Sequence, residues 1–109
     1  MTSKLTANDK RFLLNLARQT IQLAVTGGEL PKIKMEELSK ILTQNGASFV
    51  TLTLDGNLRG CIGSLEAHQP LVLDVREHAI QAALEDYRFH PVTASEVGDL
   101  KIEISHLSA

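Results

Sequence analysis

The sequence predicts an α+β domain, in which helices pack on one face of a small mixed sheet. Three observations support this fold class. Apolar residues recur at helical spacing over residues 13–25 and again over residues 71–83. Two segments in the middle of the chain alternate between apolar and polar residues on either side of an Asp-Gly turn, and the last segment alternates again. Elements in this order favour a sheet with helices on one side.

The first helix is predicted to start at the capping box Thr6-Ala7-Asn8-Asp9, where an acid follows a hydroxyl residue by three positions. It should end at Gly27-Gly28, because glycine readily adopts the left-handed backbone of a helix C-cap. A short second helix is predicted over Met35 to Leu42, before Asn45-Gly46 breaks it. The first helix should face the core with one apolar stripe, made of Leu13, Leu16, Ala17, Ile21, Ala24 and Val25.

A hairpin is predicted from two strands, Ala47 to Leu54 and Leu58 to Gly63. Asp55-Gly56-Asn57 between them is a strong turn signal. Because side chains alternate along a strand, the first strand has an apolar face and a second face made of Phe49, Thr51 and Thr53.

Two registers of this hairpin are open. A two-residue turn pairs Leu54 with Asn57 and places Arg59 and Cys61 on the apolar side of the sheet. A three-residue loop pairs Leu54 with Leu58 and leaves Arg59 and Cys61 together on the face away from the helices. We favour the three-residue loop, because burial of one face fixes strand pairing and this register collects the apolar residues of both strands on one face.

A third helix is predicted over Pro70 to Asp86, because proline suits the first helical turn and apolar residues follow at helical spacing. Tyr87 to Asp99 is interpreted as a connection, and Leu100 to Leu107 as the last strand. This strand–helix–strand order predicts a right-handed crossover that makes one parallel or mixed pairing in the sheet. The solvent side of the third helix is expected to hold Asp74, Glu77, His78, Gln81 and Glu85.

Composition limits the classes of function. The chain has 109 residues, which suits a single domain over 1–109, and 43% hydrophobic residues with 22% charged residues indicate a folded protein. A formal net charge of -2 argues against non-specific binding to nucleic acid or to an anionic membrane. One cysteine excludes an internal disulfide, and neither a signal peptide nor a membrane-spanning apolar run is recognised. We therefore expect a cytoplasmic location.

The strongest candidates for chemistry are Arg59 and Cys61. A guanidinium near a thiol favours the nucleophilic thiolate, and arginine also binds carboxylate or phosphate. If Ile102 and Ile104 face the helices, Glu103 shares the Arg59–Cys61 face and could pair with Arg59 or move a proton. The candidate catalytic residues are thus Cys61, Arg59 and Glu103. The simpler alternative is that Cys61 is a small buried hydrophobe and that Arg59 and Glu103 form an ordinary cross-strand ion pair.

Further candidates for ligand binding surround this pair. Gly60 and Gly63 would let a ligand approach the backbone closely, although a strand glycine can also mark a bulge. His68 follows in a loop and could reach Cys61, but a loop histidine is more often simply solvated. No zinc-site spacing and no phosphate-binding glycine loop are present, so we predict neither a metal nor a cofactor. The candidate ligand-binding residues are Gly60, Gly63, Ser64, His68, Arg88 and His90.

The segment Leu58-Arg59-Gly60-Cys61-Ile62-Gly63-Ser64-Leu65 resembles the hallmark of the AMMECR domain family. The resemblance continues over most of the chain, including Gly46 to Leu52, Asp86 to Pro91 and Leu100 to Ser108, with Ser48 as an extra residue. Tyr87 and His90 depart from the family pattern. Since family members continue into a second lobe, the resemblance implies a domain similar to the first part of the family fold.

The resemblance implies no defined reaction. In many microbes, members of this family look like partners of a Memo-type protein and a radical S-adenosylmethionine enzyme. One hypothesis is a cysteine-dependent enzyme, or enzyme subunit, acting on a small polar or anionic ligand at Leu58 to Gly63. The other is a non-catalytic binding or adaptor domain. A solvent-reachable Cys61 beside Arg59 in a cleft would favour the first hypothesis, and a packed thiol would favour the second.

A homodimer is also expected. If no second lobe covers the sheet, Phe49 and one strand edge face water, and an uncovered edge is a template for pairing with another chain. The alternative is a monomer, because polar residues would keep that face in water: Thr51, Thr53, Arg59, Lys101 and Glu103.

Overall fold

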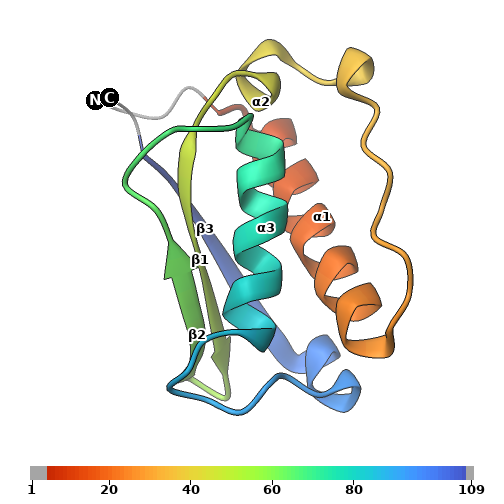
Figure 1. The fold of residues 1–109 in the computed structure, drawn as a ribbon, viewed down its shortest axis with the longest axis vertical. Coiled ribbons are helices and arrows are strands. Elements are labelled where there is room, and N and C mark those ends of the chain that lie inside the picture. Colours follow the sequence, from red (N-terminus) through yellow and green to blue (C-terminus); the bar gives the residue numbers. More distant parts are fainter. Residues whose placement is uncertain (1–4, 108–109) are drawn as a thin grey trace.

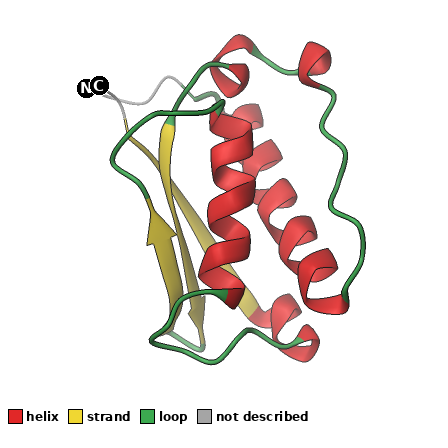
Figure 2. Ribbon diagram, viewed as in Figure 1, coloured by secondary structure: helices red, strands yellow, loops and turns green. Residues whose placement is uncertain are grey.

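In the computed structural model, which describes residues 5–107, a three-stranded sheet carries the helices on one face (Figures 1 and 2). This arrangement confirms the predicted α+β fold. Among the described residues, none packs over the opposite face, which we call the open face. The elements in chain order are α1 (Ala7–Thr26), the 3₁₀ turn η1 (Met35–Glu37), α2 (Lys40–Thr43), β1 (Ala47–Leu54), β2 (Asn57–Gly63), α3 (Leu71–Leu84), the 3₁₀ turn η2 (Ala94–Asp99) and β3 (Leu100–Leu107).

The sheet has the strand order β2-β1-β3, and both pairings are antiparallel. The prediction of a mixed sheet with one parallel pairing was therefore wrong. The crossover through α3 does exist, and it brings β3 parallel to β2 in direction. However, β1 lies between them, because β3 pairs with the free edge of β1 along its whole length, from Leu54 opposite Leu100 to Ala47 opposite Leu107.

The first helix follows its sequence signals. The Thr6 hydroxyl accepts the backbone N–H of Asp9 and the Asp9 carboxylate accepts that of Thr6, both at 3.0 Å, which completes the predicted capping box. Gly27 ends the helix with a left-handed φ of 75°. No helix of residues 5–107 combines the length and apolar character needed to cross a membrane.

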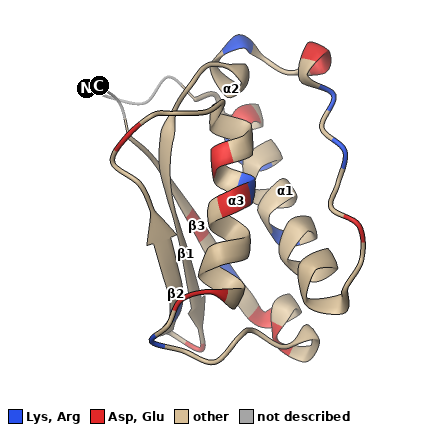
Figure 3. Ribbon diagram, in the orientation of Figure 1, with Lys and Arg blue, Asp and Glu red and all other residues tan. Residues whose placement is uncertain are grey.

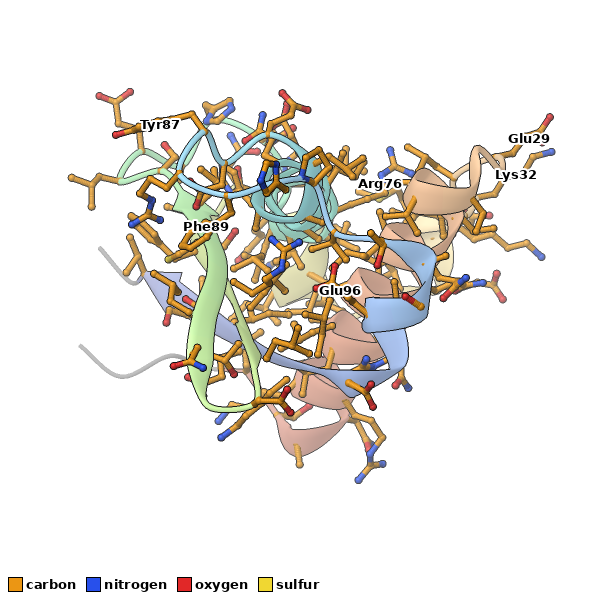
Figure 4. All side chains as sticks on the ribbon, turned by 90° about the horizontal axis from the view of Figure 1, so that it is seen from below. Glu29, Lys32, Arg76, Tyr87, Phe89 and Glu96 are labelled. Carbon is orange, nitrogen blue, oxygen red and sulfur yellow. The ribbon has the colours of Figure 1, made fainter. Side chains whose placement is uncertain are left out.

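The helix predicted over residues 35–42 is broken into η1 and α2. Leu38 adopts an extended backbone between them, and the Ser39 hydroxyl donates to Asp9 Oδ1 at 2.8 Å, which ties this segment to the start of α1. The preceding loop is held from the other side, because Arg76 of α3 donates to the Pro31 carbonyl at 3.0 Å. Figure 4 shows Arg76 directed toward this loop, in which Glu29 and Lys32 lie.

The helix α3 is covered on two sides, by the sheet and by α1 (Figure 1). Asp74 has no exposed surface and His78 is 5% exposed, so placing these two residues on the solvent side was wrong. The prediction assumed that α3 has one buried face. In the structure, a second row of α3 residues, spaced four positions apart, faces the sheet. Glu77 and Glu85 are exposed as expected.

The hairpin combines both of the registers considered above. Asp55 and Gly56, with φ of 52° and 82°, form a two-residue turn that pairs Leu54 with Asn57. A bulge then shifts the register, because Thr53 lies opposite Leu58 but Leu52 lies opposite Gly60. The extra residue, Arg59, restores the alternation that we expected from the longer loop.

Candidate functional site

The bulge separates Arg59 from Cys61. Beyond it, Cys61 pairs with Thr51, so the thiol lies on the open face, as predicted. Arg59 and Gly60 together oppose Leu52, whose side chain is buried against the helices. Arg59 is therefore directed to the helix side, and the prediction that Arg59 and Cys61 share one face was wrong for Arg59.

Arg59 holds the connection that follows α3. It forms a two-pronged ion pair with Glu96, with Nε at 3.2 Å and Nη2 at 3.0 Å from the two carboxylate oxygens. It also donates to the carbonyls of His90 at 2.7 Å and Pro91 at 3.3 Å. The Arg59 hydrogen bonds, helped by the Thr93 backbone N–H, lower the pKa of Glu96 to about 2. This guanidinium is thus occupied by four contacts within the chain.

Cys61 is held through its backbone as well as its thiol. Its Sγ lies 3.2 Å from the Thr51 hydroxyl. Its N–H, on the outer edge of β2, donates to Asp86 Oδ2 at 3.0 Å, and its carbonyl lies 3.5 Å from Arg88 Nη2. Arg88 also binds both oxygens of Asp86, at 2.7 and 3.0 Å, which holds the pKa of the buried Asp86 carboxyl well below its usual range. Asp86 and Arg88 therefore occupy the strand edge at Cys61.

The space beside Gly60 and Gly63 is filled by neighbouring groups of the protein and is not open to a ligand. A Cβ at Gly60 would overlap the Ala82 carbonyl of α3. A Cβ at Gly63 would overlap the ring of Phe49, its partner across the hairpin. Gly60 thus lets α3 approach β2, and Gly63 receives an aromatic ring on the open face.

Glu103 lies on the open face as predicted, but it is not beside Arg59. It pairs across the sheet with Thr51, which separates it from Cys61 by one strand. Its carboxylate lies 3.4 Å from Lys101 Nζ, an exposed ion pair that contributes little to stability.

The loop candidates lie elsewhere. Ser64 Oγ accepts the Glu66 N–H at 3.2 Å, and His68 Nδ1 lies 3.3 Å from the Glu66 carbonyl, so both side chains bond within their own loop. His68 lies beside Asp74 and Glu77 of α3, and not beside Cys61.

A surface depression of about 420 Å³ lies beside this part of β2. Arg88 is its most exposed cation, with a side chain 45% exposed and a guanidinium 5.3 Å from the centre of the Phe89 ring. Tyr87 is 94% exposed. In Figure 4, Tyr87 and Phe89 lie beside β2, on the connection that leads to Glu96. The lining residues are Arg59, Tyr87, Arg88, Phe89 and His90.

A family model described as AMMECR1 matches residues 14–109. The chain belongs to the AMMECR1 family. This confirms the resemblance identified from the sequence around Leu58 to Gly63.

Relatives of known sequence agree with this assignment to AMMECR1. A protein of Methanothermobacter thermautotrophicus is 38% identical over 104 residues, which cover 95% of this chain and 54% of the relative. A protein of Methanopyrus kandleri is 40% identical over 111 residues, which cover 99% of this chain and 53% of the relative. The crystal structure of an uncharacterized protein from Pyrococcus horikoshii matches with a TM-score of 0.88 and 32% identity, over 97% of this chain and 54% of that one. The chain thus spans about half the length of these AMMECR1 relatives.

Sequence reasoning missed several residues of the AMMECR1 site. Thr93 and Glu96 form a second capping box at η2, and their spacing in the sequence could have revealed it. Asp86 was assigned only to a helix end, since nothing local indicates that its carboxylate binds Cys61. A buried cluster was also missed, in which Ser48 Oγ lies 2.7 Å from Asp74 Oδ2 and 3.2 Å from His78 Nδ1. Its burial leaves no room for a substrate at Ser48.

Proposed function

We propose that this chain is a non-catalytic binding domain, and that its ligand presents a small anionic group to the depression beside β2. In this proposal the motif Leu58 to Gly63 builds the site, and Cys61 takes no part in a reaction.

One observation carries this proposal: the described contacts of the motif are structural. Arg59 is bound to Glu96 and two carbonyls, Gly60 receives α3, and Gly63 receives Phe49. Cys61 has Thr51 beside its thiol, with Asp86 and Arg88 at its backbone. A nucleophilic cysteine needs a base or cation at its sulfur, and Arg59 lies on the opposite side of the sheet. The nearer arginine, Arg88, contacts the backbone carbonyl of Cys61 and is paired with both oxygens of Asp86.

The groups that line the depression suit an anionic ligand. Arg88 contributes a guanidinium and His90 an exposed imidazole, while Arg59 lines the depression with its guanidinium already bound within the chain. The carboxylates that neutralise the two arginines, Asp86 and Glu96, are partly or wholly buried and do not line the depression. They fix the guanidiniums in place, which lowers the entropy cost of binding an anion. Arg88 Nη1 makes no hydrogen bond within residues 5–107 and is available to a ligand.

A nuclear magnetic resonance titration tests the proposal, with inorganic phosphate as the probe and sodium chloride as the control for ionic strength. We expect weak, saturable shifts confined to residues 59 and 87–90. The Cys61→Ala variant should respond like the natural chain, whereas a Tyr87→Ala/His90→Ala double variant should bind at least severalfold more weakly. Arg11→Gln, which removes an exposed arginine of α1, is the matched control and should bind normally.

Two results would contradict the proposal. Shifts that never saturate, or that spread evenly over the surface, would exclude a built site. Loss of binding in Cys61→Ala alone would instead support the cysteine-dependent enzyme. On the strength of the family resemblance, a Memo-type protein and a radical S-adenosylmethionine enzyme remain the proposed partners of the binding domain.

A further inference from the structure

We propose that His68, Asp74 and Glu77 form a site for a divalent first-row metal ion, such as Zn²⁺ or Mn²⁺. One ligand atom from each of these residues lies within 4.8 Å of the others. The site lies at the first turns of α3 and the loop before it, and it shares no residue with the depression beside β2.

The three residues supply a mixed set of ligands. An imidazole nitrogen suits zinc and other transition metals, and carboxylate oxygens suit both zinc and manganese. Asp74 and Glu77 are three residues apart on α3, so their side chains emerge from neighbouring positions on the helix. His68 reaches the same place from the preceding loop. His68 and Glu77 are exposed and Asp74 is buried, so the ion would lie at the protein surface with room for water or a substrate atom on its outer side.

Asp74 is held for this role by the buried cluster. Its Oδ2 accepts the Ser48 hydroxyl at 2.7 Å and lies 3.2 Å from His78 Nδ1. Its Oδ1 is directed the other way, where it accepts Gln69 Nε2 at 3.0 Å. One oxygen is thus fixed inside the protein while the other faces the proposed site, which is how neighbouring residues orient a metal-binding carboxylate.

His68 is also prepared as a ligand. Its Nδ1 lies 3.3 Å from the Glu66 carbonyl, and because a carbonyl only accepts, this contact requires the proton on Nδ1. The lone pair is then on Nε2. A backbone carbonyl is one of the groups that fix the tautomer of a metal-binding histidine in this way.

Among the described residues, Asp74 and Glu77 have no permanently charged cationic partner. Within residues 5–107, no lysine or arginine forms an ion pair with Asp74 or Glu77. Figure 3 shows acidic segments on the upper half of α3, but the adjacent Arg76 is directed away, to the Pro31 carbonyl. The two acids are bridged instead by the neutral Gln69 amide, whose Nε2 donates to both, at 3.0 and 2.7 Å. A cation would neutralise these carboxylates, and the Gln69 carbonyl could turn to face it.

Isothermal calorimetry with Zn²⁺ on chelator-treated protein tests the site. We expect one equivalent to bind, and the dissociation constant to rise at least tenfold in His68→Ala and in Glu77→Gln. Both side chains are exposed, so these variants should fold normally, which circular dichroism will verify. Glu85→Gln, an exposed acid at the end of α3, and His90→Ala are matched controls and should bind like the natural chain.

A second measurement locates the ion. Substoichiometric Mn²⁺ should broaden the amide resonances of residues 66–69 and 74–78 before any others. Two outcomes would overturn the proposal: no saturable binding of Zn²⁺ or Mn²⁺, or binding that His68→Ala and Glu77→Gln leave unchanged. Broadening centred on the open face or on residues 87–90 would equally reject a site on α3.

Discussion

The backbone of Gly60 lies against the carbonyl of Ala82, so that a strand and a helix touch without an intervening side chain. This contact sets how closely α3 approaches β2. It also gives the glycine of the motif a role that needs no ligand, because any Cβ at this position would overlap the helix.

Gly60→Ala should therefore be strongly destabilising. We expect a loss of about 2–3 kcal/mol or more, because a methyl group against fixed backbone cannot be relieved by a rotamer change. Gly98→Ala is the matched control: no atom lies within 4 Å of its added Cβ, and the free energy of unfolding should change by no more than about 0.5 kcal/mol. Urea denaturation of the two variants measures the difference, and equal stabilities would refute the proposed role of Gly60.

The pair Arg59 and Glu96 should make stability depend on acid pH. The pKa of Glu96 is lowered from 4.5 to about 2 in the folded chain, so the unfolded chain binds this proton more readily. The carboxylate stabilises the fold above pH 4.5, and that contribution is lost as the pH falls toward 2. In Glu96→Gln, stability should fall less steeply over this range. Denaturation at a series of pH values checks this, and Glu103→Gln, an exposed acid, should keep the natural slope.

The buried cluster should contribute to stability through Ser48. Ser48→Ala removes the hydroxyl that donates to Asp74 and leaves a buried carboxylate with one partner fewer. We expect a cost of about 1–3 kcal/mol in unfolding free energy. Ser105→Ala, on the exposed open face, should change stability by no more than about 0.5 kcal/mol. If Ser48→Ala left the free energy of unfolding unchanged, the cluster would not need the hydroxyl.

The open face is where we expect self-association. It presents the partly exposed Phe49, Thr51 and Cys61, and no described residue covers it. A two-fold dimer through this face should appear by light scattering at micromolar concentration. Thr51→Lys places a charge at the centre of β1 and should shift the mass to that of a monomer. The control Gln19→Lys, at an exposed position of α1, should leave the mass unchanged. A monomer at every concentration for the natural chain would end this hypothesis.

Regular periodicity predicted most of the helices and strands but not the irregularities within them. The bounds of β1 and β3 agree with the predicted strands, because alternation and turn residues are local signals. A bulge was expected only as an alternative role of the strand glycines Gly60 and Gly63, and its effect on the register was not predicted because both registers assumed regular strands. One inserted residue satisfies both the Asp55-Gly56 turn and the apolar face, and neither register alone could do so.

The contents of the site depend on contacts between distant residues. Cys61 could be placed on the open face from alternation, but its neighbours Asp86 and Arg88 come from beyond α3. Asp74 and His78 were assigned to solvent because their polarity suggested it, whereas Ser48 supplies a buried partner from another element. Such pairings follow from tertiary structure, for which hydrophobic periodicity carries no information.

The position of β1 at the centre of the sheet has a consequence for the order in which the chain folds. Its partner β2 follows at once, but its partner β3 is the last of the three strands to leave the ribosome. During synthesis the hairpin must wait, with one side of β1 unpaired, until α3 and the connection have emerged. Closing so large a loop is slow compared with forming a hairpin. We expect the nascent chain to be most prone to aggregation and proteolysis in this interval, which ends when Leu100 to Leu107 joins the sheet.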